Sequence, residues 1–228
     1  MPRESFDRYL HQLQDEVLIL GSMVDKAIDR SMEALKKRDL ELARQVVTND
    51  PRINQQRLDI EGKCIGLIVT QQPVASDLRI IVAVLNIIID LERIGDHAEG
   101  IAKIALMLGD EPPLKPLVDL PRMAEKARDM LQRSLDAFIN HNVEAARKIS
   151  AEDDEVDNLY DQVFRELLTY MAEDPKTITR ATRLIWVAHN LERSADRVTN
   201  ICERVVFTVT GKMEEIGSSK YQQYFRLN

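Results

Sequence analysis

The stretch Asp90–Asp96 (DLERIGD) recurs one hundred residues later as Asn190–Asp196 (NLERSAD). Three further blocks recur in the same order at an offset of 103: Arg30–Leu35 returns as Arg133–Phe138, Asp39–Arg44 as Asn142–Arg147, and Asp50–Asn54 as Asp153–Asp157. Blocks that recur in order at a nearly fixed spacing are the sequence signature of a repeated structural unit. The chain is therefore a tandem duplication of one unit of roughly a hundred residues.

Composition limits the class of protein. The chain has 228 residues, of which 44% are hydrophobic and 30% charged, and it contains only eight Gly and eight Pro. These values predict a soluble protein with long uninterrupted elements. The net charge of -7 argues against a nucleic-acid partner, because such proteins neutralise phosphates with basic residues. We expect a cytoplasmic protein, since no apolar run is long enough for a membrane span and the N-terminus is too polar for a signal peptide. Cys64 and Cys202 are expected to be buried, reduced thiols.

Hydrophobic periodicity predicts helices throughout. Leu13, Val17, Leu20, Val24 and Ile28 follow the three- and four-residue steps of an apolar helix face, and no window shows the alternation of a strand. Asp39 is placed to cap the second helix, and Pro51, preceded by Asp50, is expected to interrupt or kink it. The first expected helix ends near Arg38. The five that follow run over about Asp39–Gln71, Ala75–Leu108, Asp119–Asn140, Val143–Glu173 and Pro175–Thr210.

The fold class follows from these helices and from a proline-rich break between the two copies. Long helices joined by short turns pack antiparallel, so we predict an all-α protein of two tandem three-helix bundles, arranged end to end or side by side. The tail carries Tyr221, Tyr224 and Phe225, and it is expected either to pack on the bundle or to bind a partner. The predicted parts are a first bundle at 1–109, a linker at 110–117, a second bundle at 118–211 and a tail at 212–228.

Acidic residues four apart supply the candidate site. Residues at this spacing stand on the same helix face, and the antiparallel hairpin of each half brings two such pairs together. We expect these side chains on the outside of a bundle or along a groove between helices. The candidate metal ligands are Asp50, Asn54, Glu92 and Asp96 in the first half, and Asp153, Asp157, Glu192 and Asp196 in the second.

Converging carboxylates repel one another unless a cation lies between them, and oxygen ligands suit hard cations. The pattern predicts divalent or trivalent metal ions, with Fe, Zn, Mn and Mg as candidates. The alternative is that Arg93 and Arg193 turn these acids into ordinary surface salt bridges. Histidines add little: His97 and His189 are expected to be surface or helix-flank residues rather than ligands.

The motifs resemble the PhoU family. The resemblance is carried by Gln72–Arg79 (QPVASDLR), Leu91–His97 (LERIGDH), Leu191–Arg193 with Asp196, and Thr199–Ile201, and it extends from about residue 5 to residue 212. Within this family two departures stand out. Asn54 replaces a carboxylate, and Arg197 follows Asp196 where the usual ending has a histidine.

The resemblance implies two similar three-helix bundles and a cytoplasmic negative regulator of the phosphate-starvation (Pho) response and of phosphate uptake. It implies an adaptor between the ATPase subunit of the Pst phosphate transporter and a PhoR-type histidine kinase, peripheral to membrane complexes, homodimeric and without enzymatic activity. Some family members bind multinuclear iron or zinc clusters through paired acidic motifs, which map onto the eight candidate ligands.

Two other functions compete with the adaptor. One is a metal-binding helical scaffold without a role in phosphate signalling. The other is a di-iron carboxylate enzyme, which the sequence disfavours because that class places Glu-x-x-His inside a bundle. None of the four histidines has an acidic residue three positions before it.

Overall fold

The computed structural model describes residues 3–216, with side chains from Phe6 onward. This part of the chain is helical and contains no strand, as the periodicity predicts. The first half is formed by α1 (Arg3–Lys37), α2 (Leu40–Gln71) and α3 (Ser76–Leu108). The second half is formed by α4 (Asp119–Ile139), α5 (Val143–Ala151), α6 (Asp153–Glu173), a short 3-10 turn η1 (Pro175–Thr177) and α7 (Ile178–Thr210).

The two halves repeat the same local structure. Asp39 caps α2 by accepting a hydrogen bond from the backbone N–H of Leu42 at 2.9 Å, which confirms the predicted cap. Its counterpart Asn142 caps α5 in the same way. Each cap follows a residue in the left-handed backbone region, Arg38 in the first half and His141 in the second, with φ values of 57° and 51°. The duplication is therefore preserved in the turns as well as in the sequence.

The second helix departs from expectation in each half, in opposite ways. α2 runs without a break through Pro51, although this residue has no N–H for the carbonyl of Val47. The predicted single helix from Val143 to Glu173 is instead divided between α5 and α6 at Glu152. There the N–H of Glu152 donates to Ile149 and the N–H of Glu155 to Glu152, both at 3.0 Å. These three-residue hydrogen bonds replace the four-residue bonds of an α-helix and tighten one turn.

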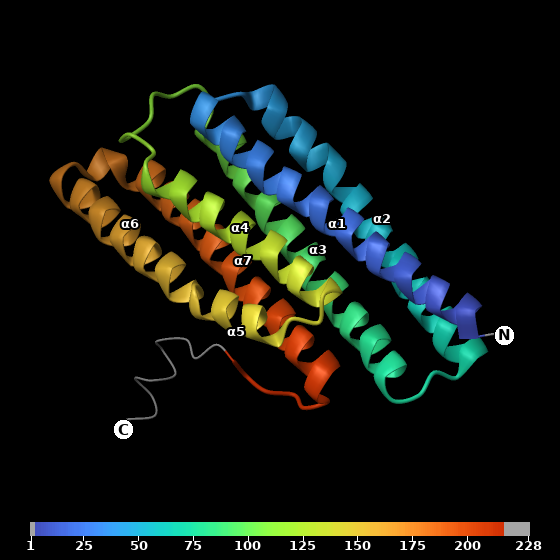
Figure 1. The fold of residues 1–228 in the computed structure, drawn as a ribbon. Coiled ribbons are helices and arrows are strands. Elements are labelled where there is room, and N and C mark those ends of the chain that lie inside the picture. The colour runs from blue at the N-terminus through green and yellow to red at the C-terminus, as the bar shows by residue number, and fades with distance from the viewer. Residues whose placement is uncertain (1–2, 217–228) are drawn as a thin grey trace.

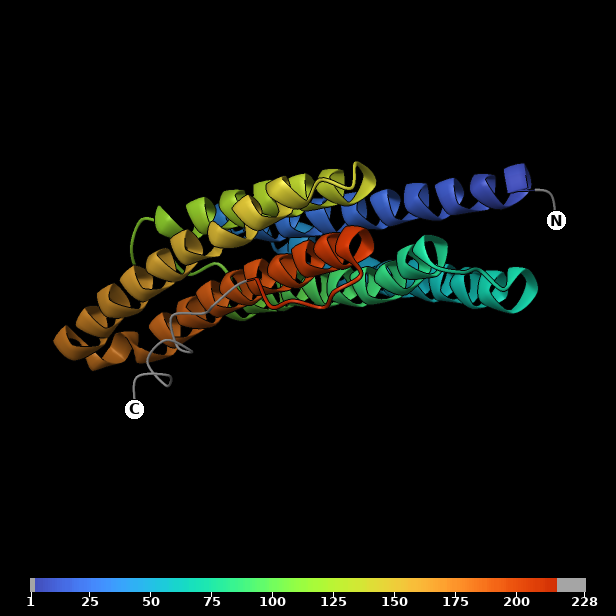
Figure 2. The same cartoon turned by 60° about the horizontal axis from the view of Figure 1, so that its bottom comes forward.

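The halves lie side by side, and α3 is next to α7 in both views (Figures 1 and 2). This pairing is the most extensive helix contact among the described residues, and α1 also packs on α4. Each half is a three-helix bundle when α5 and α6 are counted as one interrupted helix. The cores join into a single cluster of buried apolar side chains. Its largest fully buried members include Phe138, Leu20, Ile28, Ile87 and Leu91.

Polar groups also cross the α3–α7 interface. Buried Asp90 accepts from the side-chain amide of Asn200 at 3.1 Å and lies 3.4 Å from Arg197. Burial raises the pKa of Asp90, which these two partners oppose. On the other side of the crossing, a methyl group on Gly100 would contact Asn190 at 3.3 Å. The helices therefore approach closely because small or mutually satisfied groups meet at the crossing.

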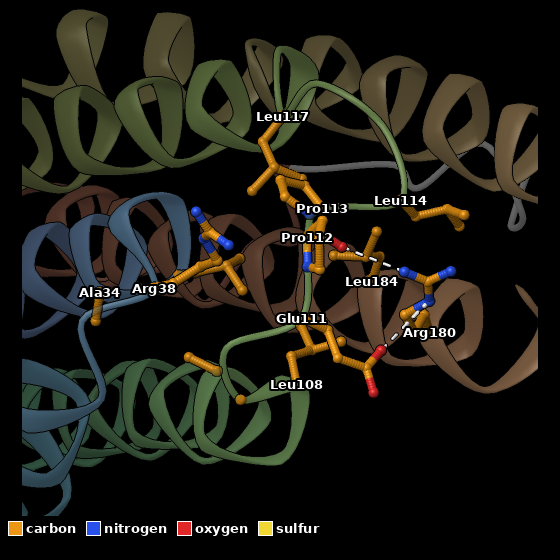
Figure 3. A pocket seen from close by; sticks show the side chains of 13 residues that line it. Ala34, Arg38, Leu108, Glu111, Pro112, Pro113, Leu114, Leu117, Arg180 and Leu184 are labelled. Carbon is orange, nitrogen blue, oxygen red and sulfur yellow. Dashed lines mark hydrogen bonds and ion pairs between the residues drawn. The ribbon is translucent and has the colours of Figure 1, made fainter.

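The linker between the halves is held by arginines from both of them. Figure 3 shows the Arg180 guanidinium contacting the carbonyl of Pro112 at 3.2 Å and the carboxylate of Glu111 at 3.6 Å. Arg38 donates to the carbonyl of Asp110. Below the linker is a mainly apolar pocket that includes Leu117 and Leu184. These contacts fix the linker across the ends of α1, α3 and α7.

The tail begins by turning back along α7. Glu214 pairs with Arg147 at 2.7 Å, and the N–H of Ile216 donates to Glu203 at 3.3 Å. The predicted packing of Tyr221, Tyr224 and Phe225 lies outside the described residues.

Two further expectations concern thiols and membranes. Cys64 and Cys202 are free and buried, as expected, and burial raises the pKa of each thiol to about 12. Over residues 3–216, every helix is too short or too polar to cross a membrane.

Candidate functional site

The acidic residues of the second half lie where the start of α6 faces the middle of α7. α6 carries Asp153 and Asp157 one turn apart, and α7 carries Glu192 and Asp196 at the same spacing. Burial and the negative charges of the other three residues raise the pKa of Asp153. The structure thus brings the four predicted side chains of this half together, and we call them the second acidic cluster.

The second acidic cluster is strongly destabilised as a set of anions. Burial, followed by the charges of Asp196, Asp157 and Glu192, raises the pKa of Asp153 to about 8. Burial and the charges of Asp196 and Asp157 likewise raise the pKa of Glu192 to about 7. Asp153 Oδ1 and Glu192 Oε2 are buried without a hydrogen-bond partner among the described residues. Such groups are rare in folded proteins and indicate a place for a proton or a cation.

The available positive groups compensate the cluster only in part. Arg193 Nη1 lies 3.6 Å from Asp196 Oδ2, and His189 Nδ1 lies 3.4 Å from Glu192 Oε2 without forming a hydrogen bond. The predicted salt-bridge alternative therefore describes Asp196 better than Asp153. Arg197, which stands where the family usually has a histidine, lies 3.4 Å from Asp90 across the α3–α7 interface.

The first half forms the equivalent first acidic cluster from α2 and α3. Its members are Asp50, Asn54, Glu92 and Asp96. The Asn54 amide donates to Asp50 Oδ2 at 3.0 Å and takes the place that a carboxylate occupies in the second half. Burial is the main cause that raises the pKa of Asp50, followed by the charge of Glu99 and then that of Asp96, while Lys103 opposes the rise. The first cluster is therefore less crowded with charge than the second.

The α3 members of the first cluster and the α7 members of the second are equally exposed. The side chains of Glu92 and Asp96 retain 19% and 37% of their accessible surface, and those of Glu192 and Asp196 retain 19% and 36%. Arg93 pairs with Asp96 at 3.1 Å just as Arg193 pairs with Asp196. These carboxylates are therefore partly accessible from solvent rather than enclosed in the core.

The donor set of the second cluster fits a hard cation, because it combines four carboxylates with two buried oxygens that have no hydrogen-bond partner among residues 3–216. As the side chains stand, no three His, Cys, Asp or Glu side chains of the described residues are grouped closely enough to hold a metal ion. Binding would therefore require these carboxylates to move inward.

Sequence reasoning missed two features of the site region. Glu99 was not among the predicted ligands, yet among the charged groups it has the largest effect on Asp50; its position one turn beyond Asp96 is the signal that points to it. His97, expected on the surface or on a helix flank, lies half-buried with Nδ1 3.3 Å from Ser194 Oγ of α7, a contact that the sequence did not predict. Burial and then the charge of Arg197 lower the pKa of His97 to about 4.

The raised pKa values predict how stability depends on pH. In the metal-free protein, Asp153 binds a proton in the folded state up to about pH 8, whereas the unfolded chain releases it near pH 4. The folded state therefore binds more protons between these values, and its stability must fall as pH rises through this window. We expect a loss of about 3–4 kcal/mol between pH 5 and pH 8 from Asp153, because each pH unit in this window costs about 1.4 kcal/mol for one extra bound proton. Urea titrations in a chelator measure it.

The control for this prediction is Asp153→Asn, which cannot titrate. Its stability should fall less steeply than that of the parent over the same pH range. Parallel curves for the two proteins would show that Asp153 is not the titrating group.

The fold and the acidic clusters define a class of protein: a duplicated, all-helical protein in which each half carries an acidic cluster on its second and third helices. The PhoU domain profile matches this chain twice, at residues 17–105 and 120–205. The chain belongs to the PhoU family.

Relatives and solved structures agree. The chain is 40% identical over 217 residues to the phosphate-specific transport system accessory protein PhoU homolog of Clostridium acetobutylicum, covering 95% of this chain and 99% of the relative. It is 44% identical over 184 residues to the protein with the same description from Aquifex aeolicus, covering 81% and 83%.

Two crystal structures show the same fold. The phosphate transport system regulatory protein PhoU of Streptococcus pneumoniae has a TM-score of 0.86 at 33% identity, covering 92% of this chain and 99% of that one. PhoU of Pseudomonas aeruginosa has a TM-score of 0.86 at 36% identity, covering 91% and 100%.

Proposed function

We propose that this chain is an accessory protein of phosphate transport that restrains phosphate uptake and the phosphate-starvation response when phosphate is plentiful. It acts as an adaptor between the ATPase subunit of a Pst-type transporter and a PhoR-type histidine kinase. The observation that carries this proposal is the double match to the PhoU domain over both halves, together with relatives described as accessory proteins of phosphate-specific transport. The protein works in the cytoplasm as a homodimer and catalyses no reaction.

An adaptor can transmit a signal only if it binds one state of a partner more tightly than another. The rigid, joined core of the two halves suits this role, because it holds surfaces of both at fixed positions. We propose that the two acidic clusters bind metal ions, with Fe, Zn, Mn and Mg as candidates. Bound cations would neutralise the repelling carboxylates and reshape the charge of this face.

The position of the acids weighs against a catalytic di-iron site. Those enzymes hold their ligands inside the bundle. Here Glu92, Asp96, Glu192 and Asp196 keep a fifth to a third of their side-chain surface accessible. Partly accessible clusters of this kind suit metal ions that change the charge of a surface rather than metal ions that activate a buried substrate.

A deletion strain tests the proposed regulation. Alkaline phosphatase activity in high phosphate should be high without the gene and should return to the low parental level when the gene is restored. Affinity purification of the tagged chain should recover the transporter ATPase and the kinase. Unchanged phosphatase activity and recovery of neither partner would favour the scaffold without a phosphate role.

A further inference from the structure

The first half contains a further, mainly apolar groove, which Asp50 lines and which faces α1. It has a volume of about 250 Å3 and lies between α1 and α2, with α3 beneath it. Three basic side chains line it: Lys26 and Arg30 from α1, and Arg52 from α2. Asn49 of α2 stands among them. The volume is that of roughly eight water molecules, so the groove has room for a small polar ligand.

The duplication shows what the same position holds in the second half. At the offset of 103, Arg30 corresponds to Arg133 and Asn49 to Glu152. Arg133 donates to both carboxylate oxygens of Glu152, with Nη1 2.9 Å from Oε1. Lys126 adds a third contact at 2.7 Å. These hydrogen bonds lower the pKa of Glu152 to about 2, and the one from Arg133 has the largest effect. A carboxylate therefore stands at this position of the second half as a stable anion paired with Arg133 and Lys126.

The groove of the first half keeps the arginine, as Arg30, but has Asn49 in place of the carboxylate. Arg30 donates instead to the neutral side chain of Gln45, at 2.7 Å. Lys26 and Arg52 pair with no acidic side chain among residues 3–216. In the second half their counterparts are Asp129 and Glu155, so the charge at both positions is reversed between the copies. The position that holds the Glu152 carboxylate in the second half is thus lined, in the first half, by basic side chains that have no acidic partner among the described residues.

Two carboxylates face the same groove from its floor. Asp50 accepts a hydrogen bond from Asn54, and Glu99 is paired with Lys103 at 2.6 Å. Each is therefore engaged on its own side of the groove. The three basic groups on the α1–α2 side have no acidic partner within the described part of the chain, and they leave the upper part of the groove positive.

We propose that this groove binds a small tetrahedral oxyanion of the phosphate type, held by Arg30, Lys26 and Arg52 where the Glu152 carboxylate stands in the second half. Guanidinium and ammonium groups recognise such oxyanions through charge-assisted hydrogen bonds. Three positive groups suit a phosphate-type ion, which carries between one and two negative charges at neutral pH, better than a single carboxylate. Asp50 of the first acidic cluster lines the floor of this groove, but the proposed contacts to the anion come from basic side chains and need no bound metal.

Titration calorimetry of the full chain with inorganic phosphate tests the proposal. Chelator-treated protein in low-salt chloride buffer excludes bridging by metal. We expect binding that sulfate competes for, that acetate does not, and that added salt weakens. Lys26→Gln with Arg30→Gln should weaken binding by at least about tenfold, because a charge-assisted contact is lost. The matched control, Lys36→Gln with Lys37→Gln, removes the same charge from exposed positions of α1 and should leave binding unchanged.

Asn49→Glu is the sharper variant. It restores the carboxylate of the second half, so it should occupy Arg30, weaken phosphate binding by at least about tenfold and leave the fold intact. The control Gln132→Glu makes the same charge change on an exposed face of α4. No binding to the parent chain, or equal affinity for phosphate in the parent and Asn49→Glu, would overturn the proposal. Either outcome leaves the metal content of the acidic clusters and the deletion-strain test unaffected.

Discussion

Replacing Asp153 with Asn and Glu192 with Gln is expected to abolish metal binding by the second half and, at the same time, to stabilise the metal-free fold. Both carboxyl groups have strongly raised pKa values because they are buried near other acids. Amides keep the shape and remove the repulsion, so the metal-free variant should gain about 1–3 kcal/mol of unfolding free energy at pH 8. Elemental analysis gives the metal content, and urea titration gives the stability.

The matched control for this variant is Asp161→Asn with Glu173→Gln, which removes two exposed acids from the same helix α6 outside the cluster. It should retain the metal and the parental stability. A cluster variant that keeps its metal, or that is less stable than the parent without metal, would contradict a cation site. The opposite signs of the two effects separate such a site from a structural salt-bridge network, whose removal destabilises the fold.

Phe138→Ala is expected to cause a large loss of stability from a single substitution. Phe138 on α4 has no accessible surface and is among the largest fully buried side chains. Truncating it removes the apolar contacts and leaves a cavity, at a cost of about 3–5 kcal/mol. Urea or thermal unfolding measures the change.

Phe164→Ala makes the same chemical change on the surface of α6. Phe164 is 38% exposed and stacks on Tyr160 with ring centroids 6.2 Å apart. Its loss should cost only about 1 kcal/mol. Equal costs for the two phenylalanines would mean that the second half does not pack as described.

Much of the fold could be predicted because the sequence encodes it twice. The recurrence of LER at residues 91–93 and 191–193 placed the third helix of each half, and Asp39 marked the start of α2. The turn at Glu152 was not predictable from propensity, because it depends on hydrogen bonds between residues three apart. Pro51 misled for the opposite reason: its penalty is local, whereas α2 is held by packing along its whole length.

The candidate site was predictable in its membership but not in its energetics. Helical spacing placed Asp153 and Asp157 opposite Glu192 and Asp196. It did not show that Asp153 would be buried deeply enough for its pKa to rise to about 8. It also did not predict the contact of His97 with Ser194, because the packing of α3 against α7 joins residues about a hundred positions apart.

The two copies differ in chemistry at positions that the shared motifs do not mark. Asn49 and Glu152 are equivalent positions with different side chains, and only the structure shows that Glu152 is bound by Arg133 and Lys126. The same difference leaves Arg30 with a neutral partner. Drift after duplication has therefore given the halves one frame and two charge patterns.

An anomalous difference map tests most directly whether the two acidic clusters bind cations. The crystals of the chain would be grown with iron, zinc or manganese. We predict peaks between Asp153, Glu192 and Asp196, and weaker peaks at Asp50, Glu92 and Asp96, where Asn54 removes one negative charge. A map of metal-loaded crystals with no peak at either acidic cluster, or with peaks only elsewhere, would contradict cation binding at these sites.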